Sequence, residues 1–192
     1  LWAPTEELSR IAMSVFITML FGFSFSHYLT EQHQELRRLA NLDPLTGIGN
    51  RRALQRALAE SVESSIRYAC TASLLVIDLD HFKKVNDAVG HVEGDRVLCK
   101  VVELLRCRIR QTDRVFRYGG EEFVVVAPHT TLANATRMAE QLRRHIAALK
   151  TRSDGPISVS IGVTELIAGE SVDDWMERGD RALYRAKKTG RN

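Results

Sequence analysis

The sequence predicts an α/β sandwich in which a mixed β-sheet lies between layers of helices. Segments with apolar residues at helical spacing alternate with short apolar runs rich in β-branched residues. Their order is helix, strand, two helices, two strands, helix, strand, helix, with no internal repeat. Pro128 and Pro156 fall outside every expected element, as residues that interrupt helices and strands should. These observations favour one folded domain with a central sheet.

The individual elements follow from periodicity, glycines and caps. The expected helices are residues 51–67, 82–89, 92–109, 132–149 and 172–189. The expected strands are residues 72–79, 115–118, 122–127 and 157–166. Asn50 is placed to cap the first of these helices, and Gly90 ends the second. Gly119 and Gly120 join the second and third strands as a hairpin.

The composition is that of an ordinary globular protein. The chain has 192 residues, of which 44% are hydrophobic and 27% charged. This balance excludes disorder, collagen-like repeats and a disulfide-stabilised mini-protein. Cys70, Cys99 and Cys107 have no metal-ligand or CxxC spacing, so reduced thiols in a cytosol are expected rather than a zinc or redox site. A net charge of +3 gives no reason to expect nucleic acid as a partner.

The first thirty residues differ from the rest. Residues 11–30 contain no Asp, Glu, Lys or Arg, and 13 of these 20 residues are apolar. A helix of this length spans about 30 Å, the thickness of a bilayer core. Residues 1–30 are therefore predicted to contain a transmembrane helix; the less favoured alternative is a buried helix in the dimer interface of a soluble protein. Arg37 and Arg38 would mark the cytoplasmic side.

Residues 31–42 are expected to form a helical connector that pairs with its copy in a dimer. Apolar residues at 29, 36, 39 and 42 provide the spacing for this pairing. The domain proper is expected over residues 43–192. Because the chain begins with Leu1 rather than Met, it is expected to be part of a longer protein, with any sensor region before Leu1.

Acidic residues gather at two predicted loop positions. Asp78 and Asp80 end the apolar strand 72–79 and, by strand alternation, face the same way. Glu121 and Glu122 follow the two hairpin glycines. If the hairpin lies beside the first strand, these carboxylates form a hard-oxygen site suited to Mg²⁺ and a nucleotide phosphate. The alternative is that Asp80 caps the next helix and the hairpin acids belong to a solvated turn.

Asn86 and Asp95 are polar residues near the apolar faces of their helices. A guanine base offers N1–H and N2–H₂ as donors and O6 and N3 as acceptors. An aspartate can accept from the donors, and an asparagine amide can provide the complement. The alternative is that both residues cap helix ends.

Several motifs together resemble the GGDEF family, the diguanylate cyclases of bacterial signalling. The resemblance covers about residues 41–192 and rests on several motifs in family order. The matching segments are the opening motif at 43–52, the acidic segment at 78–95, Gly119-Gly-Glu-Glu-Phe123 and the closing motif at 182–192. Glu121 stands where the family name has Asp, which keeps the carboxylate. The resemblance implies a palm-like nucleotidyl-cyclase fold with a mostly antiparallel sheet.

The resemblance implies a reaction in which two GTP molecules become cyclic di-GMP and two pyrophosphates. Each domain binds one GTP, so a homodimer is required. Mg²⁺, with Mn²⁺ as a substitute, would be held by Asp78, the Leu79 carbonyl, Glu121 and, in support, Glu122. Glu121 is also implied as general base for the attacking 3′-OH, although a metal-bound carboxylate is a poor base.

The remaining implied roles concern phosphate, base and product. Lys83 would stabilise phosphate charge in the transition state. The residues implied for GTP binding are Asn86, His91 and Asp95 around guanine, and Lys187 and Arg191 at the outer phosphates. Arg110 and Asp113 match the family's RxxD site, which binds the inhibitory product; the alternative is an ordinary helix end. Arg137, Arg143 and Arg144 are the candidates for a further arginine of that site.

Two other functions compete with this interpretation. The domain can be a catalytically silent receptor for GTP or cyclic di-GMP, or another Mg²⁺-dependent nucleotidyl cyclase or transferase. With the predicted membrane helix, the expected location is the inner membrane of a bacterium, with the catalytic domain in the cytoplasm.

Overall fold

The computed structural model describes residues 10, 13–28, 41–150 and 157–190, and the chain divides into two units, Leu1–Ala40 and Asn41–Asn192. In the first unit, residues 13–28 are helical. Its phenylalanines are exposed, from 60% for Phe25 to 77% for Phe21. Among the described residues, no helix is long and apolar enough to cross a membrane. Most of the predicted connector, residues 31–40, lies outside the described residues, so its helical form stays a prediction.

The second unit is built on a four-stranded sheet with the order β2-β3-β1-β4. The strands are β1 (Ala72–Leu79), β2 (Arg114–Arg117), β3 (Glu122–Pro128) and β4 (Val159–Glu165). All three strand pairings are antiparallel. The prediction of a mostly antiparallel sheet is confirmed. Within the described part of the chain, its parallel component is a single isolated bridge between Gly49 and Phe116.

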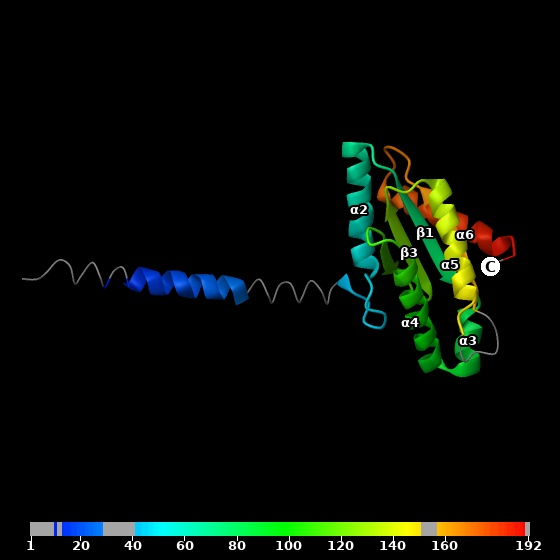
Figure 1. The fold of residues 1–192 in the computed structure, drawn as a ribbon, viewed down its shortest axis with the longest axis horizontal. Coiled ribbons are helices and arrows are strands. Elements are labelled where there is room, and N and C mark those ends of the chain that lie inside the picture. The colour runs from blue at the N-terminus through cyan, green and yellow to red at the C-terminus, as the bar shows by residue number, and fades with distance from the viewer. Residues whose placement is uncertain (1–9, 11–12, 29–40, 151–156, 191–192) are drawn as a thin grey trace, which may run out of the picture. The chain divides into compact units, whose positions relative to one another are not determined.

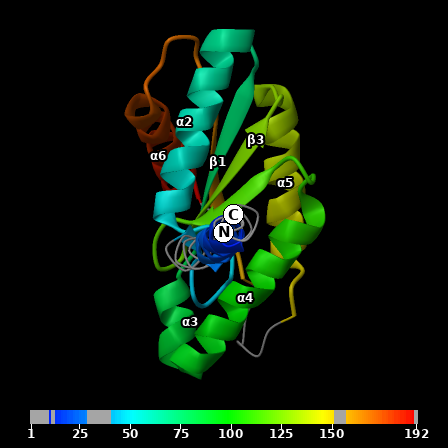
Figure 2. The ribbon, with the colours of Figure 1, turned by 90° about the vertical axis from the view of Figure 1, so that its left-hand side faces the viewer.

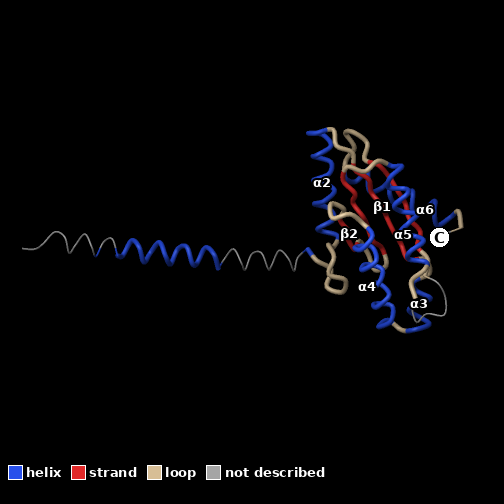
Figure 3. The backbone as a smooth tube through the Cα atoms, viewed as in Figure 1, coloured by secondary structure: helices blue, strands red, loops and turns tan. Residues whose placement is uncertain are grey.

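Helices cover both faces of this sheet (Figures 1 and 3). They are α2 (Arg51–Tyr68), α3 (Phe82–Val89), α4 (His91–Arg108), α5 (Leu132–Ala147) and α6 (Val172–Lys188). In Figure 2 the sheet lies between α2 and α6 on one side and α4 and α5 on the other. All predicted elements are present, with bounds within two residues of the predicted ones. Asn50 caps α2 as expected, because its side chain accepts from the N–H groups of Arg52 and Ala53.

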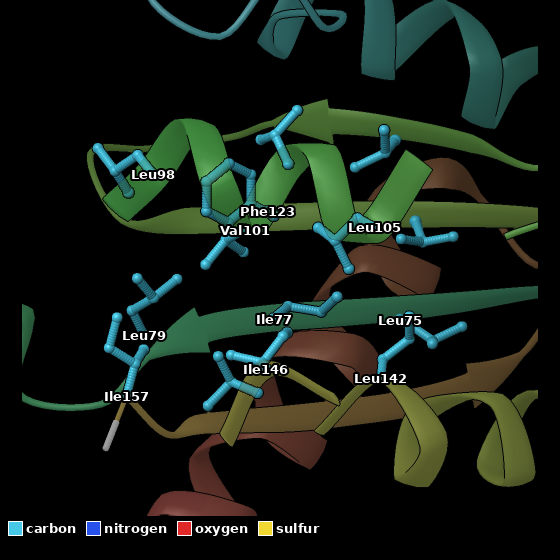
Figure 4. Close-up of a cluster of buried hydrophobic side chains, with 14 of the residues drawn as sticks. Leu75, Ile77, Leu79, Leu98, Val101, Leu105, Phe123, Leu142, Ile146 and Ile157 are labelled. Carbon is cyan, nitrogen blue, oxygen red and sulfur yellow. The ribbon is translucent and has the colours of Figure 1, made fainter. Parts of the chain in front are cut away.

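Alternation along β1 divides the core into two layers. Leu75, Ile77 and Leu79 pack with α4 and α5, as Figure 4 shows, whereas Leu74 and Val76 pack with α2 and α6. Each fully buried side chain of this kind contributes about 1.5–3 kcal/mol. The same alternation carries Asp78 to the face covered by α2 and α6. The core therefore fixes where the acid at the end of β1 points.

Candidate active site

The end of β1 and the β2–β3 hairpin lie side by side, which is the condition on which the predicted carboxylate site depends. Asp78 pairs in register with Glu122 of β3 and with Ser160 of β4. The Leu79 N–H donates to the Glu121 carbonyl at 3.3 Å. This contact attaches the hairpin loop directly to the strand that carries Asp78.

The carboxylates at this end of the sheet share one lysine. Asp78 is 5% exposed, and the Lys187 ammonium of α6 lies 2.8 Å from its Oδ2. Burial, and next the charge of Asp78, raise the pKa of both Glu121 and Glu122, while Lys187 opposes this shift. The negative charge of the cluster thus exceeds what its lysine neutralises.

This donor set fits a divalent cation. Carboxylate and carbonyl oxygens are the ligands that Mg²⁺ and Mn²⁺ prefer, and Mg²⁺ is commonly held by one or two carboxylates with substrate phosphates and water. Among the described residues, no group of three or more His, Cys, Asp or Glu side chains is arranged to hold a metal ion. The charges of Asp78, Glu121 and Glu122 act on one another, and Leu79 follows Asp78 in the chain.

Asp80 has a structural role. It is 7% exposed and accepts hydrogen bonds from the hydroxyls of Ser158 at 2.8 Å and Ser160 at 2.7 Å. Since Ser160 lies opposite Asp78 in the sheet, both acids are on the same face, as predicted. The alternative prediction that Asp80 caps α3 is wrong, because the N-cap residue of that helix is His81.

The predicted guanine-reading residues meet where α3 packs on α4. The Asn86 amide rests on the backbone at Gly94, where an added Cβ would lie 1.8 Å from Asn86 Oδ1. Asp95 is the next residue, and both it and His91 are exposed near the start of α4. The alternative that Asn86 and Asp95 cap helices is wrong, since His81, Gly90 and Ile109 occupy the cap positions of α3 and α4. The contact between α3 and α4 therefore places Asn86 against Gly94, one residue before Asp95.

Lys83 and Arg191 are the other two cations predicted to contact phosphate. Lys83 is exposed on the first turn of α3, which begins two residues after Asp80. Arg191 lies outside the described residues, so its expected contact with phosphate stays a prediction.

Arg110 and Asp113 form a second polar site at the other end of the sheet. The Arg110 N–H donates to Asp113 Oδ2 at 2.9 Å, and the Asp113 N–H donates to the Arg110 carbonyl at 3.0 Å. Asp113 therefore does stabilise the turn after α4. Its Oδ1, however, is buried and has no hydrogen-bond partner among the described residues.

The fold distinguishes among the three arginines considered for this second site. A groove of about 240 Å³ is lined by Arg110, Asp113 and Arg137, together with residues of α5 and the loop before it. Arg143 and Arg144 instead form ion pairs with Glu140. Arg137 is the arginine placed beside Arg110 and Asp113.

Two residues of the first site were not found from the sequence. Asp180 of α6 interacts with Glu122, and burial raises the pKa of Asp180. It precedes Lys187 by seven residues, so helical periodicity places both on one face and could have indicated it. Arg117 donates to the Gly120 carbonyl in the loop that carries Glu121, and it also binds the Asp43 carboxylate. Asp43 lies 74 residues away in the sequence, too far for residue spacing to reveal the contact.

Comparison with known proteins identifies the family of the chain. Residues 40–192 match the family model described as "Diguanylate cyclase, GGDEF domain". The chain is 42% identical to diguanylate cyclase DgcP of Pseudomonas aeruginosa over 88% of its length, and 41% identical to DgcM of Escherichia coli over 86%. Its fold matches the coiled coil and GGDEF domain of DgcB from Caulobacter crescentus, solved with c-di-GMP, with a TM-score of 0.83 and 33% identity over 93% of this chain and 96% of that chain. The chain belongs to the GGDEF family.

The curated relatives are longer proteins. The alignment covers 25% of DgcP and 41% of DgcM. It also covers 42% of the response regulator PleD of Caulobacter vibrioides, to which the chain is 38% identical over 98% of its own length. The shared part is the GGDEF domain with a short preceding segment.

Proposed function

We propose that this chain is the catalytic part of a diguanylate cyclase that condenses two GTP molecules into cyclic di-GMP. The observation that carries the proposal is the cluster of Asp78, Glu121 and Glu122 with Lys187, at the end of β1, in a chain of the GGDEF family. DgcP and DgcM, its relatives, are named as diguanylate cyclases.

In the proposed reaction, the 3′-oxygen of one GTP attacks the α-phosphorus of the other. The bond from that phosphorus to the bridging oxygen breaks, and pyrophosphate leaves with the bonding electrons. Glu121, with its raised pKa, is the carboxylate proposed to accept the 3′-OH proton. Lys83 and Lys187 provide positive charge for the phosphates. Two such displacements close the ring.

Mg²⁺ or Mn²⁺, when bound, supplies positive charge that stabilises the phosphate oxygens. Asp78, Glu121 and the Leu79 carbonyl are proposed to hold it, with Glu122 in support. Lys187 already neutralises part of the Asp78 charge, so it also limits repulsion while the site awaits its substrate.

Guanine recognition is assigned to the contact between α3 and α4. The Asp95 carboxylate is proposed to accept from N1–H and N2–H₂, and the Asn86 amide to provide the complementary contact beside His91. Truncating either residue should weaken binding by about 1–3 kcal/mol, because base donors or acceptors are left without partners. In either variant, the affinity for GTP should fall by a larger factor than any rise in the affinity for ATP.

Catalysis is proposed to require a homodimer, because each domain holds one GTP and the two must face each other. The exposed apolar side chains of residues 13–28 need burial against a copy or in a bilayer. With the uncharged run 11–30 followed by Arg37 and Arg38, we propose an inner-membrane protein whose domain lies in the cytoplasm.

Product inhibition is proposed for the groove of Arg110, Asp113 and Arg137. An arginine can bind a phosphate or the Hoogsteen edge of guanine with two hydrogen bonds, and the unpartnered Asp113 Oδ1 can accept from a guanine N–H. The groove therefore offers the polar groups that a guanine dinucleotide requires.

The test is incubation of the purified chain with GTP and Mg²⁺ or Mn²⁺, followed by chromatography and mass analysis, with Glu121→Ala as control. Cyclic di-GMP from the parent and none from the control supports the proposal. A different cyclic or linear nucleotide identifies another nucleotidyl transferase. If no product forms at high protein concentration while cyclic di-GMP binds, the silent receptor is the better description.

A further inference from the structure

The opening motif at residues 43–52 has no part in the function proposed above, yet it forms a closed turn. Asp43 Oδ1 accepts from the Thr46 N–H at 2.9 Å and from the Thr46 hydroxyl at 2.6 Å. The Asp43 N–H donates to the Ile48 carbonyl at 2.8 Å, and the Gly47 N–H to the Asp43 carbonyl at 2.9 Å. The turn thus holds the Asp43 carboxylate in a fixed direction.

The turn leads into α2, and the segment between them pairs with β2, the strand before the hairpin loop, through the bridge between Gly49 and Phe116. The Arg117 N–H donates to the Gly49 carbonyl at 2.8 Å. A Cβ at Gly49 would lie 2.4 Å from Phe116 Cδ1, so the backbone there approaches the ring as only glycine permits. The Arg51 guanidinium lies 4.8 Å from the centre of the Tyr118 ring. Residues 116–118, at the end of β2, therefore contact residues 49–51, which follow the turn.

The Arg117 side chain joins the turn to the hairpin loop. Its Nη1 lies 3.0 and 3.2 Å from the two Asp43 carboxylate oxygens, while Nη2 and Nε donate to the Gly120 carbonyl at 2.7 and 3.3 Å. Both side chains of the pair are largely buried, at 16% and 15% exposed. The guanidinium is therefore held by the carboxylate on one side and by the loop backbone on the other.

Backbone hydrogen bonds also hold the hairpin loop, from the Leu79 N–H to the Glu121 carbonyl at 3.3 Å and from the Tyr118 N–H to the Glu122 carbonyl at 2.9 Å. Gly120 is exposed, and a Cβ there would meet no atom within 4 Å. The next residue is Glu121, the proposed metal ligand and base. The Gly120 carbonyl, which directly precedes Glu121, is held by two hydrogen bonds from the Arg117 side chain.

We propose that Arg117 is a positioning residue, which Asp43 orients and which sets the place of Glu121 by holding the Gly120 carbonyl. The opening motif then acts on turnover through the loop, without touching substrate. The kinetic part of this inference rests on the proposed cyclase activity. Only a planar guanidinium reaches both acceptors with separate N–H groups, which a lysine cannot do.

The first test compares Arg117→Gln with a matched control, Arg178→Gln. Arg178 also binds a carboxylate, that of Glu170, and a backbone carbonyl, that of Glu165, but at the opposite end of β1. Arg117→Gln should lower kcat by about 10²-fold, the effect of displacing a catalytic group by about 1 Å. The KM for GTP should change by less than about threefold, because the guanine and phosphate contacts remain. Arg178→Gln should lower the melting temperature without changing kcat.

Two further variants examine the chain of contacts. Arg117→Lys should restore only part of the lost kcat. Asp43→Asn should lower kcat less than Arg117→Gln, and the double variant should be no worse than Arg117→Gln alone, since both act through one contact. Equal kcat values for Arg117→Gln and Arg178→Gln, or additive losses in the double variant, would overturn the proposal.

A measurement independent of activity separates this inference from the proposed function. Amide hydrogen exchange in the peptide covering residues 118–122 should be faster in Arg117→Gln than in the parent and in Arg178→Gln. If the parent makes no cyclic di-GMP, the cyclase proposal fails while this exchange still decides on Arg117. Unchanged exchange would show that Arg117 does not hold the loop.

Discussion

The two ends of β1 are built differently. At the Ala72 end, the Ser73 hydroxyl donates to the Thr130 carbonyl at 2.7 Å. Nearby, Arg178 pairs with Glu170 and also binds the Glu165 carbonyl. At the Leu79 end, Asp78 and the hairpin glutamates compete for Lys187. One end balances its charges, and the other keeps an excess of negative charge.

The direction of the pKa shifts expresses this difference. Hydrogen bonds from Arg178 hold the pKa of Glu170 below its ordinary value, more than offsetting burial. Burial and Asp78 raise the pKa of Glu121 and of Glu122. Folding therefore favours the ionised form of Glu170 and opposes ionisation of the two hairpin acids. One sheet therefore has one end whose ion pair stabilises the fold and another end whose excess negative charge suits the binding of a cation.

The largest expected effect is on catalysis. Glu121→Gln should reduce cyclic di-GMP formation by about 10³-fold, or about 4 kcal/mol, because a proposed metal ligand and proton acceptor is lost. Product formation is measured by chromatography. Glu170→Gln, at the balanced end, should leave the rate unchanged, and a comparable loss in that variant would remove the distinction between the two ends.

The next effect is on stability at the balanced end. Glu170→Gln should lower the free energy of unfolding by about 1.5–3 kcal/mol, because a charged hydrogen-bonding partner of Arg178 is lost. Thermal unfolding, followed by circular dichroism, should show a decrease in Tm of about 5 °C. Glu121→Gln serves as the comparison and should show no such decrease.

The ion pair between Glu170 and Arg178 predicts that the stability of the fold depends on pH. Because the folded-state pKa of Glu170 is lowered, its contribution is present above the unfolded pKa of about 4.3 and is lost as pH falls through the folded value. The difference in Tm between the parent and Glu170→Gln should therefore be full above about pH 5 and shrink on further acidification. A difference that grows in acid would contradict the assignment of the shift to Arg178.

A smaller effect is expected on the proposed inhibition by product, which a variant in the groove should weaken without changing the rate of the reaction. Arg110→Ala should raise the inhibition constant for cyclic di-GMP about tenfold, the effect of one lost charged contact. The initial rate without product should not change, since the groove lies at the end of the sheet opposite Glu121. Initial rates with added product measure both quantities. Arg143→Ala, whose arginine pairs with Glu140, is the matched control.

The smallest expected effect is a gain in stability at the charged end. Glu122→Gln removes one of the negative charges that oppose folding, so Tm at neutral pH should rise by about 1–2 °C, or roughly 0.5 kcal/mol. If Mg²⁺ neutralises this cluster, adding it should reduce the difference in Tm between Glu122→Gln and the parent. A decrease in Tm for Glu122→Gln without metal would mean that the acids do not repel one another.

The sequence predicted local structure well because the signals were local. The apolar run of β1, the two hairpin glycines and the Asn50 cap each specify an element without reference to distant residues. The placement of Asp78 beside the hairpin stayed conditional until the strand order β2-β3-β1-β4 was known. The roles of Lys187 and Asp113, in contrast, came from family resemblance, because spacing alone leaves either one an ordinary helix-end residue.

The missed contacts are those between distant parts of the chain. Asp43 and Arg117 are 74 residues apart, so no periodicity connects them. Arg137 could be separated from Arg143 and Arg144 only when the rotation of α5 over the sheet was known. Contacts of this kind depend on how helices pack on the sheet, and residue spacing in a single sequence does not predict that packing.

The thiol of Cys107 lies one residue from the lining of the groove that is proposed to bind product, which opens that groove to optical measurement. It is the exposed one of the three free cysteines and precedes Arg108, a groove residue, by one position. Cys70 and Cys99 are half-buried, and the Cys99 thiol donates to the Leu45 carbonyl. A maleimide dye should therefore label Cys107 first and report occupancy of the groove as a change in fluorescence. The chain then provides its own attachment point for a cyclic dinucleotide sensor, with no engineered cysteine.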